Sequence, residues 1–535
     1  MSEHHPFGPF SIPEIRDFVP EKLKPFVIIL FLVIIQFSGG VYVASASEMV
    51  GTTALMNEDI QMAGLSSLVG MALNFVYMFR LKCAIPPKSM FFLCGFVIII
   101  ANIICMYTTS VPLLVGTCFV AGFFRMQATF QCNSTIQLWL TPKRDLSVFF
   151  CWVYLIVNGS INLSGLQAVY LSSFAEWEMM QWSIIGMILF MLLLVQTLMR
   201  NHSSMPRIPF LGIDYIGMLM WGSSALCALF ICIYGEHYDW WTSEYIWAAT
   251  IACVVLVALS CWRASFIRHP YIFLDTFKHP IIWLCPVTYI VADILLAPEH
   301  VFEHALMEGI LGYDALHLAS LNWISILGVA TGVLFTWQTF AVRKWRYRTM
   351  LLISFCCIGT YLFYFYFKID YNLPKEALMF PIFARNFGYV TLAITVLTAN
   401  TRMPFPFHFF QGVTIQNVFS AALGSAIGCT IIGRALKVTM AKNAMLISSG
   451  IDNMNGNVQH IPLGEIYGIV QKQALIVSMK EIYGWLGLAC IAVIFVLLLR
   501  KEHLSKPIRV THPKFKTLRK MIKHELRTSK ENASF

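Results

Sequence analysis

Long apolar stretches separated by short polar connections run through this chain from residue 25 to residue 500. Hydrophobic residues make up 58% of its 535 positions and charged residues only 12%, so a soluble fold could not bury the apolar surface. A helix that spans a membrane needs ~20 mostly apolar residues, and it satisfies its own backbone hydrogen bonds. The sequence therefore predicts an all-α integral membrane protein with fourteen spans. We expect these spans at 25–46, 60–79, 89–109, 111–140, 147–173, 179–199, 209–234, 243–264, 279–298, 316–341, 349–367, 376–399, 404–433 and 482–500.

The charges alternate in sign from one connection to the next. With Met1 in the cytoplasm, the inner connections and helix ends hold 29 of the 38 Lys and Arg residues, whereas the outer ones hold 7. Acidic residues show the reverse, 17 outside and 10 inside, so the inner side nets +19 and the outer side −10. Lys and Arg favour the cytoplasmic face of membrane proteins. The pattern therefore predicts cytoplasmic N and C termini and an even number of spans.

Fourteen spans suggest two six-helix halves with an inserted helix pair between them. A basic, Pro-containing linker at 200–209 is typical of the connection that joins such halves. We expect a cytoplasmic lead at 1–24, an N-terminal six-helix bundle at 25–200, and a linker with inserted helices 7 and 8 at 201–278. A C-terminal six-helix bundle follows at 279–500, with a long outer loop at 434–481. A basic cytoplasmic tail at 501–535 completes the chain.

Several short patterns around the inserted pair resemble a known transporter family. Asp214 and Gly217 begin helix 7 as Asp-x-x-Gly, and Gly235, Asp239 and Trp240 form a Gly-(x)n-Asp-Trp turn before helix 8. The stretches 274–278, 312–314, 473–476 and 481–483 add further similarities. These patterns resemble the fourteen-helix drug:proton antiporters of the major facilitator superfamily. The resemblance implies a major facilitator-type bundle and proton-coupled export of drug-like compounds.

Asp293 is the acidic residue that falls in the middle of an expected span, about fourteen residues past the inner end of helix 9. An ionised carboxylate at that depth costs ~2.5–3.5 kcal/mol on insertion scales, so it must be protonated, paired or next to water. A carboxyl group balanced between these states can load and release a proton. We therefore expect Asp293 to couple proton movement to transport, and the alternative is a static ion pair that fixes helix packing.

Arg125 and Arg385 are the basic residues within expected spans. Either guanidinium could pair with Asp293 or hold an anionic substrate through two parallel hydrogen bonds. Gln127 and Gln131 place a polar stripe on helix 4, where they could line a substrate cavity. The alternative for this stripe is hydrogen bonding between helices, which averages only ~0.6 kcal/mol per bond.

Three further residues are expected to have structural roles. Asp214 is placed to cap the start of helix 7, and Trp240 and Trp241 fit an aromatic anchor at the membrane interface. A His-x-x-Glu-His pattern at 300–304 has metal-binding spacing, but no third ligand is evident, so no metal site is predicted. No enzyme activity or cofactor is expected, and the proton gradient would supply the energy.

The sequence thus predicts a secondary active transporter that works by alternating access, in a bacterial inner membrane. The expected partners are a small-molecule substrate, the lipid bilayer and, through the 434–481 loop, a periplasmic adaptor with an outer-membrane channel. No nucleic-acid partner is expected. The missing Gly-Pro signature in helix 5 favours an uptake symporter as the alternative, and a non-transporting membrane scaffold or sensor is the alternative outside transport.

Overall fold

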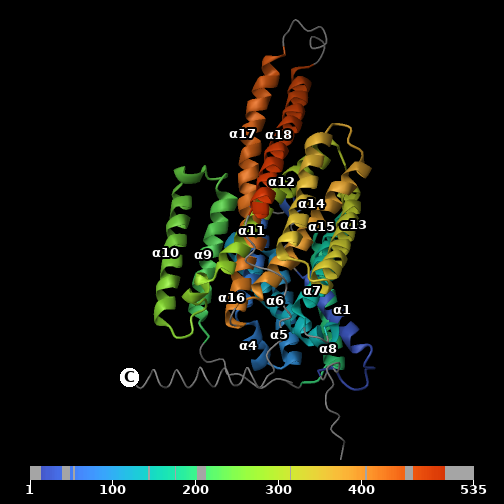
Figure 1. Cartoon of the computed structure of the whole chain (residues 1–535), viewed down its shortest axis with the longest axis vertical. Coiled ribbons are helices and arrows are strands. Elements are labelled where there is room, and N and C mark those ends of the chain that lie inside the picture. The colour runs from blue at the N-terminus through green and yellow to red at the C-terminus, as the bar shows by residue number, and fades with distance from the viewer. Residues whose placement is uncertain are drawn as a thin grey trace, which may run out of the picture.

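The computed structural model describes most of the chain as helix (Figure 1). The described residues are 12, 14–38, 49–51, 55–141, 145–174, 176–201, 213–313, 315–403, 406–451 and 462–499. Within these ranges the structure contains no β-strand, and its single β-bridge joins Ile15 to Met199. The expected basic tail at 501–535 lies outside the described residues.

Among the described residues, the N-terminal half and the inserted pair are built from nine α-helices and two short 3₁₀ helices. The first half comprises α1 (Lys24–Phe37), α3 (Asn57–Asn74), α4 (Met78–Ala84), α5 (Pro87–Tyr107), α6 (Val111–Leu140), α7 (Leu146–Phe174) and α8 (Glu178–Leu198). The inserted segment comprises α9 (Tyr215–Tyr234), η2 (Trp240–Thr242), α10 (Glu244–Phe266) and η3 (Leu274–Lys278).

The C-terminal half contains longer and less regular helices. They are α11 (Pro280–Leu296), α12 (Pro298–His304), η4 (Ala305–Ile310), α13 (Ala315–Thr336), η5 (Trp337–Val342), α14 (Tyr347–Lys368), α15 (Lys375–Asn400), α16 (Pro406–Asn417), η6 (Val418–Gly424), α17 (Ser425–Ser449) and α18 (Leu463–Leu499). The segments η4, η5 and η6 are π-helical turns that continue the helices before them. Such turns occur often at functional sites.

Twelve helices of the described chain are long and apolar enough to cross a membrane, or up to thirteen if one bent pair is a single span. Each of the twelve coincides with one expected span. The bent pair is α3 with α4, which meet at 67° and coincide with the span expected at 60–79. The first expected span begins with α1, which has only 14 residues. The rest of that span, from residue 39, lies outside the described residues.

The prediction of a long loop at 434–481 is wrong, because most of this segment is helical. Its residues extend α17 to Ser449 and begin α18 at Leu463. Residues such as Ala, Leu, Lys and Met favour helix, so a polar stretch that looks like a loop continues the spans instead. The 37 residues of α18 measure about 55 Å, whereas a hydrocarbon core is only ~30 Å thick. The two helices project together beyond the rest of the bundle (Figure 1).

Small residues let the helices of the first half approach closely. A Cβ atom on Gly122 would lie 2.0 Å from the Ser67 carbonyl oxygen, and one on Gly70 would lie 2.1 Å from the Phe119 carbonyl oxygen. The backbones of α3 and α6 therefore touch, as is common between helices in membranes. This contact fixes α3 just before it bends into α4.

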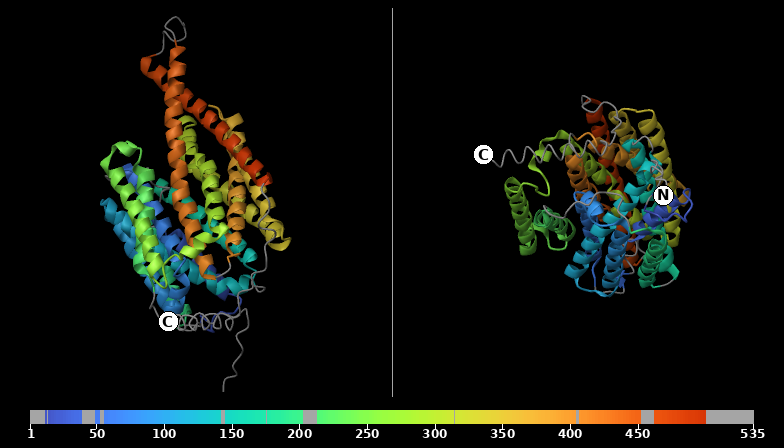
Figure 2. Two further views of the ribbon diagram at one scale, coloured as in Figure 1. Left: turned by 60° about the vertical axis from the view of Figure 1, so that its left-hand side comes forward. Right: turned by 90° about the horizontal axis from the view of Figure 1, so that it is seen from below.

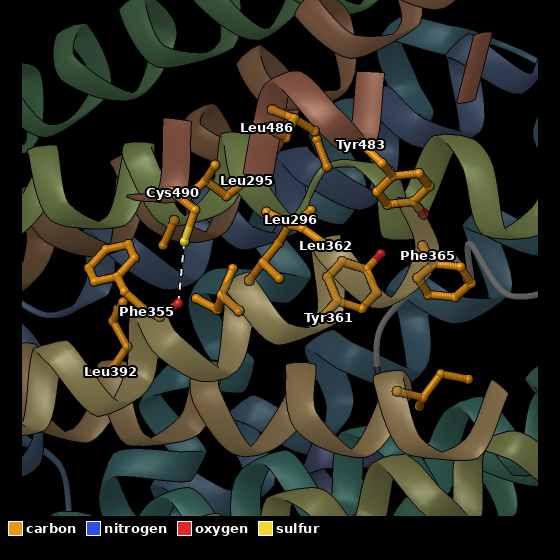
Figure 3. Packing of buried hydrophobic residues seen from close by; sticks show 14 of the residues in the cluster. Leu295, Leu296, Phe355, Tyr361, Leu362, Phe365, Leu392, Tyr483, Leu486 and Cys490 are labelled. Carbon is orange, nitrogen blue, oxygen red and sulfur yellow. Dashed lines mark hydrogen bonds between the residues drawn. The ribbon is translucent and has the colours of Figure 1, made fainter. Parts of the chain in front are cut away.

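The two halves meet along α7, which packs against α13 and α15, and along α3, which packs against η6. The second half has its own apolar core, in which side chains from α11, α14 and α18 interlock (Figure 3). There the thiol of Cys490 donates to the Phe355 carbonyl oxygen at 3.3 Å. The second half is therefore a packed unit in its own right.

The inserted pair stands beside the bundle, with α10 outermost (Figures 1 and 2). At one end, Glu236 accepts hydrogen bonds from Arg434 and Lys437 of α17, at 3.0 and 3.1 Å. Burial raises the pKa of Glu236, but hydrogen bonds from Lys437, Trp240 and Arg434 outweigh it and leave the pKa below its ordinary value. The carboxylate is therefore ionised at neutral pH and ties α9 to the second half.

Candidate functional site

Asp293 is buried near the end of α11, against the π-helical turn of the neighbouring helix. A Cβ atom on Gly424 would lie 2.3 Å from Asp293 Oδ2, so only glycine leaves room for the carboxylate there. Gly428 brings the backbones equally close, because its Cβ atom would lie 2.9 Å from the Asp293 carbonyl oxygen. In the part of the chain that the structure describes, Oδ2 has no hydrogen-bond partner.

Two tyrosines of the second half lie near this carboxylate, and a third from the first half bonds to one of them. Tyr289, one turn before Asp293 on α11, donates its hydroxyl to the Ala393 carbonyl oxygen at 3.2 Å. Tyr154 of α7 forms a side-chain hydrogen bond with Tyr289, and Tyr389 of α15 lies within electrostatic range of both Asp293 and Tyr154. Because α7 belongs to the first half and α11 and α15 to the second, Asp293 lies beside the seam between them.

The sequence left open whether Arg385 pairs with Asp293, and in the structure it pairs with other carboxylates. Its guanidinium forms ion pairs with Glu299, at 2.9 Å, and with Glu303. Glu303 also accepts the Tyr361 hydroxyl at 2.9 Å, and the guanidinium carbon lies 5.6 Å from the centre of the Tyr361 ring. One buried cation thus serves two carboxylates on a single helix face, and Asp293 lies outside this cluster.

Sequence reasoning missed the partners of Arg385. Glu299 and Glu303 were assigned to an outer connection, but α12 carries them into the bundle. The signal that could have found them is their spacing of four residues, which places both carboxylates on one face of a helix. Within the described residues, no group of three or more His, Cys, Asp and Glu side chains could hold a metal ion.

Arg125 lies in the first half and connects α6 to α1. Its Nη2 atom donates to the Gln36 carbonyl oxygen at 2.6 Å, and Gln36 Nε2 donates to Thr129 Oγ1 at 2.8 Å. The described contacts of Arg125 therefore hold helices of one half together. They do not bring it to Asp293 or to Arg385.

The polar stripe on α6 is buried. Gln127 Nε2 donates to the Met78 carbonyl oxygen at 3.3 Å, which fixes α6 against the start of α4. The carboxamide of Gln131 is fully buried, and neither of its terminal atoms has a partner among the described residues. Two buried amides on one helix, only partly satisfied, are costly unless a ligand or water completes them.

Asp214 caps α9 as the sequence suggested, since its Oδ1 atom accepts from the Gly217 backbone N–H at 2.9 Å. It also does more than cap. Arg263 donates to Oδ1 from Nη2 at 3.0 Å, and the Tyr271 backbone N–H donates to Oδ2 at 3.3 Å. The Tyr77 hydroxyl donates to the Asp214 carbonyl oxygen at 3.1 Å. Asp214 therefore joins the inserted pair to the bend between α3 and α4.

Trp240 and Trp241 lie in the turn that connects α9 to α10. Trp240 Nε1 donates to Glu236 Oε2 at 3.2 Å. The Trp241 ring is exposed and lies 5.5 Å from the Trp247 ring, between ring centres. Their role as an interfacial anchor stays a prediction.

An ion pair joins the two halves at the end of the bundle that carries the 343–348 connection, which we call the basic side. Lys344 Nζ lies 2.7 Å from Asp145 Oδ2 and also donates to Ser147 Oγ at 3.0 Å. Asp145 precedes α7 in the first half, and Lys344 follows η5 in the second. The halves are therefore in contact at the basic side in this structure.

Comparisons with known proteins identify the fold. No family model and no curated protein matches the sequence. Among solved structures, a mutant of the peptide transporter POT in complex with alafosfalin aligns with a TM-score of 0.54 and 13% identity, over 91% of this chain and 97% of that one. The tetrameric peptide transporter PepTSo2 aligns with a TM-score of 0.53 and 10% identity, over 89% and 97%.

A mutant of the nucleoside transporter NupG aligns with a TM-score of 0.50 and 12% identity, over 88% of this chain and 100% of that one. At these identities the likeness concerns the fold. The described part of the chain is built from helices, twelve of them long and apolar enough to cross a membrane, and it has the fold of these peptide and nucleoside transporters. Its likeness to the drug:proton antiporters in particular remains the expectation from the sequence.

Proposed function

We propose that this protein is a secondary active transporter that exports amphipathic small molecules in exchange for protons. The observation that carries the proposal is Asp293, a buried carboxylate whose Oδ2 atom lacks a partner among the described residues and lies beside the seam of the two halves. A carboxyl group in that position is stable when it is protonated, and it would ionise when a movement of the halves lets water reach it. Proton loading and release at Asp293 can then follow the movement of the halves.

The surrounding residues support this role chemically. Arg385 is paired with Glu299 and Glu303, so its guanidinium does not hold Asp293 permanently ionised. The hydroxyl of Tyr289 is engaged by the Ala393 carbonyl oxygen at 3.2 Å, so it does not supply a hydrogen bond that would hold Asp293 ionised. Transport would not need ATP, because the proton gradient supplies the energy.

The test is substrate flux in proteoliposomes with and without an imposed pH gradient. We expect Asp293→Asn to abolish proton-driven transport at an unchanged protein level, because the amide cannot load a proton. Asp370→Asn, at an exposed position between α14 and α15, is the matched control and should transport normally. Undiminished coupling in Asp293→Asn would remove this residue from the mechanism.

Uptake by proton symport is the second candidate function. It is favoured by the likeness in fold to peptide transporters, one of which is described as a proton dependent oligopeptide transporter. The same flux assay separates the candidates. Movement of substrate against the direction of the proton supports export, and movement in the same direction supports uptake. The absence of flux with every ligand tested would support a scaffold or sensor.

The projecting ends of α17 and α18 are the proposed docking surface for a periplasmic adaptor, with both termini in the cytoplasm of a bacterial cell. The two helices are joined there by a hydrogen bond from Asn443 Nδ2 to Ser478 Oγ at 2.9 Å. Met445 and Leu463 expose their apolar side chains near the end of this hairpin. Crosslinking to the adaptor should disappear when the projecting part is removed, and persistent crosslinking would contradict docking there.

Sidedness and the count of fourteen spans have a separate test. Accessibility labelling should find the segment 343–348 and Glu299 on opposite sides of the membrane. Labelling of both from the same side would contradict the proposed arrangement.

A further inference from the structure

A cavity of about 230 Å³ lies in the first half, away from Asp293. It forms where α3 bends into α4, and α5, α6 and the start of α9 complete its wall. The lining residues are Tyr77, Leu81, Ile85, Met90, Leu93, Phe123, Phe124, Gln127, Ile213 and Tyr215. The volume is roughly eight times the ~30 Å³ that one water molecule occupies in the liquid.

Hydrogen bonds fix the wall and engage the Tyr77 hydroxyl and Gln127 Nε2, whereas Gln127 Oε1 has no partner among the described residues. The Tyr77 hydroxyl donates to the Asp214 carbonyl oxygen and accepts from the Asp214 backbone N–H, at 3.1 and 3.0 Å. Gln127 Nε2 donates to the Met78 carbonyl oxygen. The rings of Tyr77 and Tyr215 lie 6.4 Å apart, between centres. The cavity therefore presents apolar surface, and apolar cavities do not hold water well.

The cavity is open toward the side of the helix bundle. Leu93 of α5 and Tyr215 of α9 line it and are 42% and 50% exposed. Both belong to helices that are long and apolar enough to cross a membrane, so their exposed faces contact lipid. The opening of the cavity is therefore continuous with the lipid-facing surface, where it meets the hydrocarbon chains of the bilayer.

Positive charge accompanies the opening. Arg80 follows Tyr77 on α4, and its charge acts on the Tyr77 hydroxyl. Arg263 also lies at the start of α9, but it forms an ion pair with Asp214 at 3.0 Å, which compensates its charge. An acyl chain that enters the cavity would leave its headgroup at the end of the bundle where Arg80 lies. An anionic headgroup complements that charge.

We propose that this cavity binds one acyl chain of an anionic phospholipid from the surrounding leaflet. The chain fills the space between the bend of α3 and α4 and the start of α9, with Gln127 at its inner wall. Its phosphate lies close to Arg80. The bound lipid thereby holds the inserted pair against the first half, independently of what the protein transports.

The experiment is native mass spectrometry of protein released from nanodiscs that contain equal amounts of phosphatidylglycerol and phosphatidylcholine with identical chains. The wild-type protein should retain phosphatidylglycerol preferentially. Leu81→Trp and Ile85→Trp each place an indole in the cavity and should lose this bound lipid. Leu189→Trp adds the same group to an exposed site on α8 outside the cavity and should retain it.

Arg80→Gln tests the headgroup, because it leaves the cavity unchanged. We expect it to retain lipid but to lose the preference for phosphatidylglycerol. Monodisperse elution in size-exclusion chromatography identifies the variants that fold, and either indole variant alone is sufficient for the test. Wild-type protein that retains no lipid, or an indole variant that retains as much phosphatidylglycerol as Leu189→Trp, would overturn the proposal. An unchanged preference in Arg80→Gln would overturn the assignment of the headgroup.

Discussion

The ion pair between Asp145 and Lys344 provides the sharpest test of movement between the halves. The two side chains are 9% and 26% exposed, and their charged atoms are 2.7 Å apart. A hydrogen bond to a charged group contributes about 1.5–3 kcal/mol, more than a pair fully exposed to solvent. Opening the basic side must break this contact, so Asp145→Asn should raise the open population roughly ten- to hundredfold.

Hydrogen–deuterium exchange measures that population without adding a probe. Amides at the start of α7 and the end of η5 should exchange roughly ten- to hundredfold faster in Asp145→Asn, because exchange follows the open fraction. The double variant Asp145→Lys with Lys344→Asp restores opposite charges and should recover much of the protection. Wild-type exchange in Asp145→Asn, or no recovery in the double variant, would refute the role of this pair.

The pH dependence of the pair separates it from proton coupling. Burial raises the pKa of Asp145, but hydrogen bonds from Lys344 and Ser147 outweigh it and leave the pKa below its ordinary value. A carboxylate with a lowered pKa contributes its full stabilisation at any pH above the ordinary pKa of Asp, ~3.9. That stabilisation is lost only as the pH falls through the lowered pKa. Protection of the basic-side amides from hydrogen exchange, corrected for the intrinsic effect of pH on exchange, should therefore stay constant between about pH 5 and pH 8. Both pH values lie above the ordinary pKa of Asp.

The remaining predictions concern other charged and crowded positions. Arg385→Gln leaves the buried carboxylate of Glu303 and the half-buried one of Glu299 uncompensated and should cost about 3–5 kcal/mol, seen as a lower unfolding temperature in detergent. Gly424→Ala places a methyl group against Asp293 and should abolish transport, whereas Gly433→Ala, where a Cβ atom meets nothing within 4 Å, should not. Glu236→Gln should cost only about 0.2–1 kcal/mol, because its two cationic partners are exposed, and the loss should shrink in high salt.

Hydropathy predicted the helices well because every segment that spans lipid must be apolar over about 20 residues. Each of the twelve long helices in the described chain coincides with a predicted stretch, and the cap by Asp214 followed from local chain geometry. Hydropathy could not show where a helix ends outside the lipid. The stretch 434–481 is polar, but most of it forms helix because its residues favour helix and its two segments support each other through the contact of Asn443 with Ser478.

The partners of the charged residues were harder to predict, because they depend on how distant helices pack. Arg385 and Asp293 both looked like members of one site, yet Arg385 turns to Glu303, 82 residues away in the chain. The pairing of Asp145 with Lys344 spans 199 residues and leaves no local pattern in either segment. Sequence alone could therefore name the unusual charges but not decide which of them remain without a partner.

The attachment of the inserted pair to both halves has a consequence for turnover. At the basic side α9 is fastened to the first half through Asp214 and Tyr77, and at the other end Glu236 and Cys232 fasten it to α17. If the halves rock during transport, these two anchor points move in opposite directions. The inserted pair must then change its tilt relative to the bundle. Since α10 is long and apolar enough to lie in lipid, each cycle of the proposed transport would displace membrane around it, and a stiffer bilayer would slow transport even with the substrate site unchanged.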